Sequence, residues 1–205
     1  MIFGKEKIVK TQNSLKNYWE KLEDSYVRLS AFFFEIVPLS GFFLGAQYYT
    51  LIVAAIISLI LGLMVMLVFY VIEKRISKFQ IFGICMSALF TFFAYSFNDD
   101  EFVKIQPTIF NGFFSAVLLF GIFYKKAMMK QFFGSQFSLN DETWYKLSLR
   151  WGLFFLFLTI INEISWRFLE TEDWVFIKVF VLSPLVGIFM LCQLPITLKG
   201  RIKTK

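Results

Sequence analysis

Long runs of apolar residues alternate with short polar stretches along this chain. A helix rises about 1.5 Å per residue, so roughly 20 apolar residues cross the ~30 Å hydrocarbon core of a bilayer. The apolar runs are close to that length, and the stretches between them carry charged and turn-forming residues. The pattern predicts an all-α, polytopic helical membrane protein with five to six transmembrane helices, at 29–45, 48–72, 81–97, 105–124, 147–168 and 174–194.

The first run, 29–45, is short for a span and carries Glu35 and Pro38. It either crosses a thinned bilayer or enters and leaves on the same side. The polar segment before it, 1–28, is predicted to be a cytoplasmic tail or an amphipathic helix on the membrane surface. The chain therefore divides into this N-terminal segment, a transmembrane helical domain at 29–198 and a basic cytoplasmic tail at 199–205.

Basic residues concentrate in alternate loops, and acidic residues in the loops between them. Most of the 21 Lys and Arg residues lie before the first run, between the second and third, between the fourth and fifth, and after the last. Short cytoplasmic loops carry an excess of Lys and Arg, so both termini are predicted in the cytoplasm. A re-entrant first run would place the basic N-terminal segment outside, which favours six spans. The opposite loops carry Asp99, Asp100, Glu101, Glu170, Glu172 and Asp173.

Composition supports a membrane location and excludes several kinds of chemistry. Hydrophobic residues make up 58% and aromatic residues 20% of the 205 residues, more apolar surface than a soluble domain of this size can bury. The chain has no histidine, which excludes a histidine base or ligand. Cys85 and Cys192 lie in separate apolar runs and imply neither a disulfide framework nor a zinc site. No catalytic residue, cofactor or metal is predicted. The net charge of +6 is expected to interact with the lipid bilayer rather than with nucleic acid.

Polar residues within or beside the spans are the candidate functional residues, because ionisable groups in a bilayer are costly and usually face the bundle interior. Glu163 and Lys178 lie at similar depths in the last two spans, which a short hairpin joins. This predicts an ion pair between them. One interpretation of these residues is a pocket open to the outer face, for a lipid headgroup, an ion or a small solute. The other is a set of contacts that fix helix register at roughly 1 kcal/mol each. The candidate cluster comprises Asn98, Asp99, Lys104, Asn111, Asn162, Glu163 and Lys178.

A weak internal similarity relates 35–43 to 104–114, since both segments combine proline with Gly-Phe-Phe. Each would open a three-helix unit, and units three spans apart have inverted topology, as in many transporters. Phenylalanine is so frequent here, with 29 residues, that such matches arise by chance. Two three-helix inverted repeats are therefore an open possibility.

A run of residues between the third and fourth spans resembles the signature of a bacterial inner-membrane family, intracellular septation protein A. The run consists of Asn98-Asp99, Phe102-Val103-Lys104, Pro107-Thr108-Ile109 and Asn111. Further matches follow in the same order: Trp144 with Leu147, Trp151 with Phe154-Phe155, Asn162-Glu163 with Trp166, Trp174-Val175, Lys178-Val179-Phe180, and Gln193 before Pro195. Gln106, Ile177 and Val181 depart from the pattern, where Lys, Phe and Gly are usual.

The resemblance implies a multi-pass protein of the bacterial inner (plasma) membrane that acts in cell-envelope maintenance and septation. It implies contacts with membrane proteins of the division and cell-wall elongation machinery, and it brings no catalytic residues. The favoured hypothesis is an interaction protein with no chemistry of its own. The alternative is a small-solute or lipid transporter that uses the polar cluster in the outer half of the membrane. The oligomeric state is left open.

Overall fold

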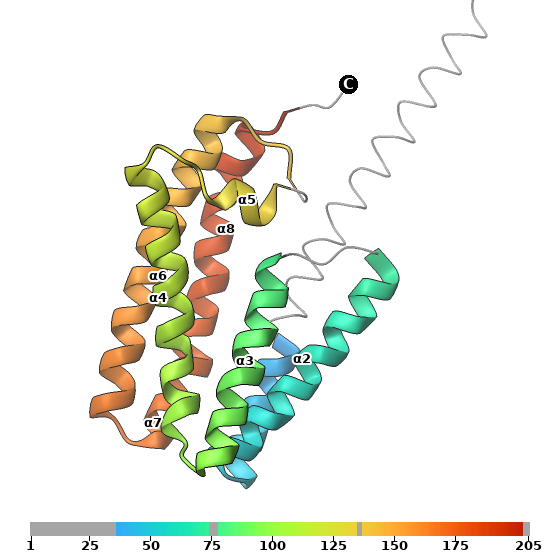
Figure 1. The fold of residues 1–205 in the computed structure, drawn as a ribbon, viewed down its shortest axis with the longest axis vertical. Helices are drawn as coiled ribbons and strands as arrows, with labels where there is room; N and C mark the ends of the chain where they lie inside the picture. Colours follow the sequence, from blue (N-terminus) through green and yellow to red (C-terminus); the bar gives the residue numbers. More distant parts are fainter. Residues whose placement is uncertain (1–35, 74–77, 135–136, 203–205) are drawn as a thin grey trace, which may run out of the picture.

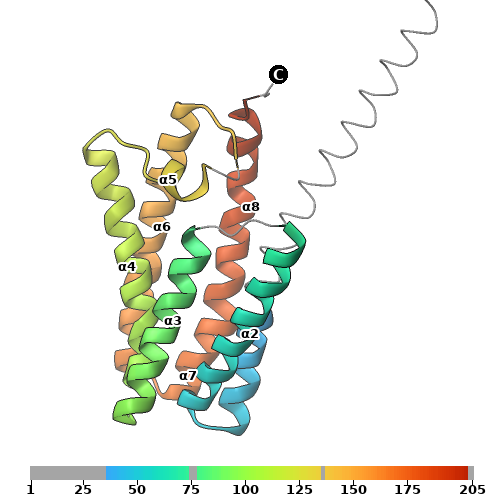
Figure 2. The same cartoon turned by 45° about the vertical axis from the view of Figure 1, so that its right-hand side comes forward.

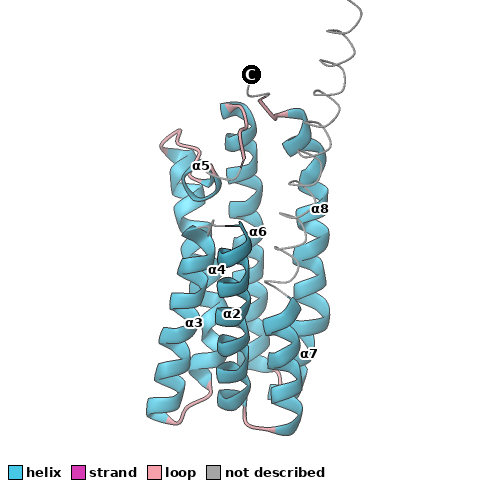
Figure 3. Cartoon of the chain, turned by 90° about the vertical axis from the view of Figure 1, so that its right-hand side faces the viewer, coloured by secondary structure: helices cyan, strands magenta, loops and turns pink. Residues whose placement is uncertain are grey.

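The computed structural model describes residues 36–73, 78–134 and 137–202, and within these ranges the ordered elements are helices without strands (Figure 3). Five helices are long and apolar enough to cross a membrane, which confirms the predicted polytopic helical membrane protein. They are α2 (Leu51–Glu73), α3 (Lys78–Phe97), α4 (Glu101–Phe123), α6 (Asp141–Phe168) and the continuous segment Thr171–Lys199.

The first predicted run appears as a shorter apolar helix, Ile36–Tyr48. At 1.5 Å per residue this helix is about 20 Å long, which is too short to cross the hydrocarbon core by itself. Residues 29–35, including Glu35, and the predicted N-terminal segment 1–28 lie outside the described residues. A sixth span, the domain boundaries and the inverted repeat therefore stay predictions.

The long helices run side by side along the longest dimension of the molecule (Figure 1). α4 and α6 are neighbours in both Figure 1 and Figure 2, and they form the most extensive helix–helix contact. The α3–α4 and α6–α7 turns lie at one end of the bundle, here called the acidic end because it carries Asp99, Asp100, Glu101 and Glu170. The opposite, basic end carries the α4–α6 connection and the end of α8, with Lys125, Lys126, Lys130, Lys146 and Lys199.

Several helices extend beyond the apolar runs that predicted them, because polar residues support their ends. α6 begins at Asp141 rather than at 147, since the side chain of Asn140 accepts a hydrogen bond of 2.8 Å from the N–H of Thr143. α4 begins at Glu101 rather than at 105, since the Asp99 carboxylate accepts one of 2.9 Å from the N–H of Glu101. Pro107 therefore lies inside α4 and not in its first turn.

The last span is one long helix with a change of winding in its middle. α7 (Thr171–Phe176) continues into a π-helical segment, η1 (Ile177–Leu182), and then into α8 (Ser183–Lys199). The N–H of Ser183 bonds to the carbonyl of Lys178, five residues earlier. Pro184 has no N–H for the carbonyl of Phe180, and its ring disfavours regular α-helix there, so the wider turn accommodates it. Pro195, predicted to follow this span, lies inside α8 instead.

Two groups of buried apolar side chains hold the bundle together. The group near the acidic end includes Phe42, Ala54, Val103 and Trp174. The group near the basic end is built from aromatic rings that meet Phe114 edge to face or at a tilt, together with Leu118, Trp144, Phe154 and Phe155. Large apolar side chains also cover the outer surface, which is the arrangement expected of a protein whose solvent is lipid.

Small residues allow the close approach of the helix Ile36–Tyr48 to α2. A Cβ atom added at Gly45 would lie 2.8 Å from the Cα of Ala54, a backbone atom that cannot move alone. Ala54 is fully buried at this contact. Such close contacts between small residues are a main source of helix association in lipid.

Gly45→Ala is expected to lower the free energy of unfolding by about 1–3 kcal/mol, because the added methyl group forces the two helices apart. Thermal unfolding of the purified chain in a mild detergent, followed by tryptophan fluorescence, measures the change. Gly187→Ala in α8 is the matched control, since no atom lies within 4 Å of the Cβ it would add. The control is expected to be neutral or to stabilise by up to about 1 kcal/mol. Equal Tm values for the two variants would contradict the close contact.

Candidate functional site

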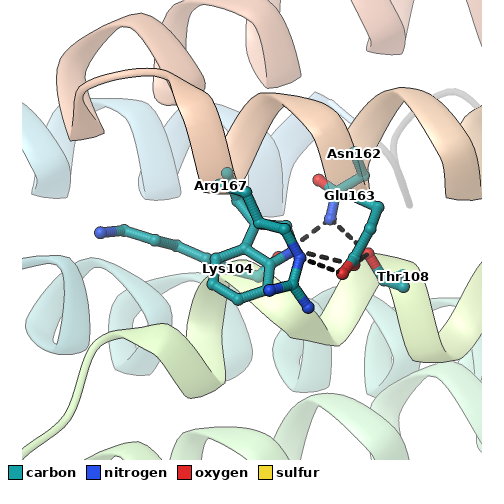
Figure 4. Close-up of polar contacts among 6 residues, drawn as sticks. Lys104, Thr108, Asn162, Glu163 and Arg167 are labelled. Atoms are coloured by element: carbon teal, nitrogen blue, oxygen red, sulfur yellow. Dashed lines mark hydrogen bonds and ion pairs between the residues drawn. The ribbon is translucent and has the colours of Figure 1, made fainter.

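The side chain of Asn162 joins three helices at the acidic end of the bundle, and Figure 4 shows its contacts with α4. Its Nδ2 group donates to the backbone carbonyl of Lys104 and to the hydroxyl of Thr108, both at 2.9 Å. Its Oδ1 atom accepts from the indole Nε1–H of Trp174 at 3.1 Å. Asn162 is 1% exposed, so water cannot replace these partners. One amide thereby fixes the positions of α4, α6 and α7 relative to one another.

The carbonyl that Asn162 covers lies next to a break in the hydrogen bonding of α4. Pro107 has no N–H to donate to the carbonyl of Val103, and its ring disturbs the surrounding turn. Within a bilayer, backbone groups near such a proline must find partners on neighbouring helices or polar side chains. The Asn162 amide adds a bond to the carbonyl of Lys104, the residue next to Val103, in the turn that Pro107 disturbs.

Glu163 continues the polar contacts from α6 towards α4. Its Oε2 atom accepts from the Thr108 hydroxyl at 3.0 Å and from the indole of Trp166 at 2.9 Å. Its Oε1 atom accepts from Arg167, whose guanidinium also lies 4.5 Å from the centre of the Trp166 ring. Thr108 thus accepts from Asn162 and donates to Glu163. We call Thr108, Asn162, Glu163, Trp174 and the Lys104 carbonyl the Asn162 network.

The ammonium group of Lys104 lies at the mouth of this network. It forms an ion pair of 3.1 Å with Asp100, one turn earlier, and donates to the hydroxyl of Thr171 at 2.9 Å. The Lys104 side chain is only 15% exposed, whereas that of Asp100 is 41% exposed. Lys104 therefore adds a second connection between α4 and the start of α7.

The predicted ion pair between Glu163 and Lys178 is wrong. Glu163 pairs with Arg167 on its own helix. The Lys178 Nζ atom lies over two aromatic rings, 4.1 Å from the centre of Phe42 and 4.8 Å from that of Trp174. The depths of the two residues are similar, but Glu163 faces α4 and Lys178 faces the helix Ile36–Tyr48. No carboxylate of the described residues lies within ion-pair distance of Lys178.

The remaining predicted residues lie outside the network. Asn98 is exposed in the α3–α4 turn and adopts a positive φ of 50°, a conformation that asparagine tolerates well. Asp99 supports the start of α4. Asn111, two residues past Ile109 in α4, has no side-chain hydrogen bond among those of the described residues. Thr108, Thr171 and Trp174 are not among the candidate residues that the sequence predicts, although Thr108 and Trp174 belong to the matching motifs.

Comparison with known proteins identifies the family. A family model described as "Intracellular septation protein A" matches residues 30–203, which is most of the chain. The chain belongs to the intracellular septation protein A family. Proteins named inner membrane-spanning protein YciB are similar to it, at 42% identity over 106 residues in Agrobacterium fabrum and 46% over 102 residues in Brucella suis. The first alignment covers 52% of this chain and 52% of the Agrobacterium fabrum protein. The second covers 50% of this chain and 51% of the Brucella suis protein.

The alignments thus span about half the length of the curated relatives that the chain matches. No solved structure matches the chain. The family description names septation and no reaction, and the relatives are named for the inner membrane that they span. Membership in the family therefore makes this chain an inner-membrane protein and assigns no role to the Asn162 network.

The network has the chemistry of a structural connection. Its buried donors and acceptors bond to one another, and within the described ranges no group of three or more His, Cys, Asp or Glu residues is arranged to hold a metal ion. A binding site would present some of these polar atoms to a cavity instead. Lys178, whose ammonium lies over the Phe42 and Trp174 rings, is the member of the predicted cluster that differs most from this pattern.

Asn162→Ala is expected to lower the free energy of unfolding by about 2–3 kcal/mol, because it removes three hydrogen bonds and leaves the buried Trp174 indole without its partner. Thermal unfolding in detergent measures the loss. Asn111→Ala is the control on α4 and should change the stability by less than about 0.5 kcal/mol. Equal losses for the two variants would contradict the central position of Asn162.

A double-mutant cycle distinguishes the observed partner of Glu163 from the predicted one. Glu163→Gln and Arg167→Gln should show a coupling energy of about 0.3–1 kcal/mol, because the pair lies one turn apart and is partly exposed, 32% for Glu163 and 53% for Arg167. Glu163→Gln and Lys178→Gln should be additive within about 0.3 kcal/mol. A larger coupling to Lys178 than to Arg167 would overturn the placement of Lys178.

Proposed function

We propose that this protein acts in cell-envelope maintenance and septation through contacts with division and cell-wall elongation proteins in the membrane. The observation that carries the proposal is the Asn162 network, in which Thr108, Asn162, Glu163 and Trp174 bond to one another. Such a network gives the bundle a defined shape and leaves its members unavailable for catalysis or transport. The description of the family supports the link to septation.

The outer faces of the bundle are suited to contacts with other membrane proteins. α8 carries Ile188 and Leu191, each 58% exposed, and α2 carries Leu67 and Val71, which are 59% and 64% exposed. Helices in lipid associate through close packing of such faces rather than through a hydrophobic driving force. A bundle of fixed shape can present these faces to a partner helix while the rest of its surface meets lipid.

The proposed orientation places both termini in the cytoplasm of a bacterium, with the protein crossing the inner membrane several times. The support is the separation of charge between the two ends of the bundle, since Lys and Arg favour the cytoplasmic side. In this orientation the Asn162 network lies in the outer half of the membrane. The basic end then faces the cytoplasm.

A second candidate function is the transport or handling of a small solute or a lipid by the outer-half polar residues. Lys178 favours it, because its ammonium lies over Phe42 and Trp174 and has no carboxylate partner among the described residues. A cation held by rings keeps its charge available to an anionic ligand, although cation–π contacts alone also stabilise such a lysine. Ligand handling requires the positive charge of Lys178, whereas the contact proposal requires Lys178 only for packing.

Complementation of a strain that lacks the protein tests the choice between them. Lys104→Gln, Glu163→Gln and Lys178→Gln are each expected to restore growth under osmotic stress when the variant reaches the wild-type level in the membrane, because the charges serve packing. Septum placement by microscopy is the second readout. A Lys178→Gln variant that is inserted, as stable as the wild type and inactive would contradict the contact proposal and support ligand handling. Proteoliposome flux would then identify the solute.

Photocrosslinking tests the contacts themselves. A photoreactive phenylalanine analogue at Leu191 should form crosslinks to division or elongation proteins in living cells, because this position faces outwards. The same analogue at Phe114, which is 1% exposed, is the control and should form none. Crosslinks from the outer faces of α2 and α8 to lipid alone would contradict the proposal.

A further inference from the structure

A cavity of about 600 Å³ lies at the basic end of the bundle, between the end of α4, the short helix α5 (Met129–Phe133) and the start of α6. Three lysines line it, Lys125, Lys126 and Lys130, together with Asp141 and Tyr145. Its volume falls within the range of small-molecule sites in proteins. No residue of the Asn162 network lines it, so this cavity is separate from the site described above.

The fold of the α4 terminus brings the first two lysines together. Lys125 adopts a positive φ of 56°, and its N–H bonds to the carbonyl of Ile122 at 3.0 Å. The N–H of Lys126 bonds to the carbonyl of Gly121 at 2.7 Å. These bonds form the usual helix-ending turn, in which the left-handed position normally holds glycine. Glycine would adopt this conformation without strain. Lysine at this position instead adds a positive charge to the wall of the cavity.

The third lysine is positioned by α5. The buried side chain of Met129 and the bond of 3.1 Å from its N–H to the Ser148 hydroxyl fix this helix against α6. Lys130 then pairs with Asp141 at 2.8 Å across the cavity wall. Among the described residues Asp141 is the one carboxylate of the lining, so three lysines and one carboxylate leave the cavity positive. An anion with several oxygen atoms can bond to more than one of the lysines at once.

Exposed aromatic residues lie directly beside these charges. Phe123 and Tyr124 immediately precede Lys125, and their side chains are 80% and 68% exposed. Their rings meet edge to face at 5.4 Å, at the end of a membrane span. Aromatic rings at this depth lie at the boundary between headgroups and acyl chains. An apolar surface next to a positive cavity matches an amphiphile, with an anionic head and hydrocarbon chains, better than a free anion.

We infer that the cavity lined by Lys125, Lys126 and Lys130 binds the phosphate of an anionic phospholipid from the leaflet at the basic end. The lipid phosphate lies among the lysine ammonium groups, and its acyl chains lie along Phe123 and Tyr124.

Binding of defined lipids to the purified full chain in dodecyl maltoside tests the inference, with native mass spectrometry as the readout. Phosphatidylglycerol is expected to bind at least about threefold more tightly than phosphatidylcholine with the same acyl chains. The triple variant Lys125→Gln/Lys126→Gln/Lys130→Gln should weaken phosphatidylglycerol binding by about tenfold. A triple Lys→Arg variant at the same positions should retain it, because it keeps the charges.

The matched control is Lys78→Gln/Lys146→Gln/Lys199→Gln, which removes three exposed lysines from the same end outside the cavity. It should change phosphatidylglycerol binding by less than about twofold, and lipid-free Tm values establish that each variant is folded. Equal weakening by the two Gln triples would overturn the inference, since the effect would then come from overall charge. Inorganic phosphate that binds as tightly as phosphatidylglycerol through the same lysines would also overturn it, because the occupant would be a soluble anion.

Discussion

The arrangement of this bundle depends on a single buried amide. Inside a bilayer the helices are surrounded by lipid, so the hydrophobic effect does not drive them together. Their association relies on close packing and on hydrogen bonds between them. Asn162 supplies bonds to α4 and α7 from a position on α6 that is almost fully buried. Because an amide bonds only over a narrow range of distances and angles, these three helices have one register in which all its partners are satisfied.

The two ends of the bundle are held by different interactions. At the acidic end, hydrogen bonds and ion pairs link the helices, and Lys104 ties the start of α7 to α4. At the basic end, aromatic packing dominates, as in the parallel stack of Phe154 on Phe189 with ring centres 3.9 Å apart. The hydroxyl of Ser148 adds a polar contact there, through the N–H of Met129. Aromatic packing and directional bonds thus act together at the basic end, where Lys130 also pairs with Asp141.

The sequence predicts the helices well because the length of an apolar run reports the thickness of the bilayer. It predicts their ends less well, since residues such as Asn140 and Asp99 extend a helix into polar sequence. It also locates Asn162 and Glu163, of which Asn162 is buried and Glu163 is half-buried. Depth along a span says nothing about rotation of the helix around its axis, which is why the predicted pairing of Glu163 with Lys178 is wrong. Thr108 was overlooked because threonine is ordinary in a membrane helix and its role appears only with its partners.

The π-helical segment η1 decides which faces of the last span point inwards. Trp174 and Gln193 are both buried in the bundle, yet they lie 19 positions apart. Successive residues of an α-helix are turned by about 100°, so an unbroken helix would turn these two side chains about 100° away from each other. A π turn absorbs one extra residue, and the remaining 18 steps make five complete rotations. The wide turn therefore brings Trp174 and Gln193 onto one side of the helix, where the first meets Asn162 and the second meets Arg150.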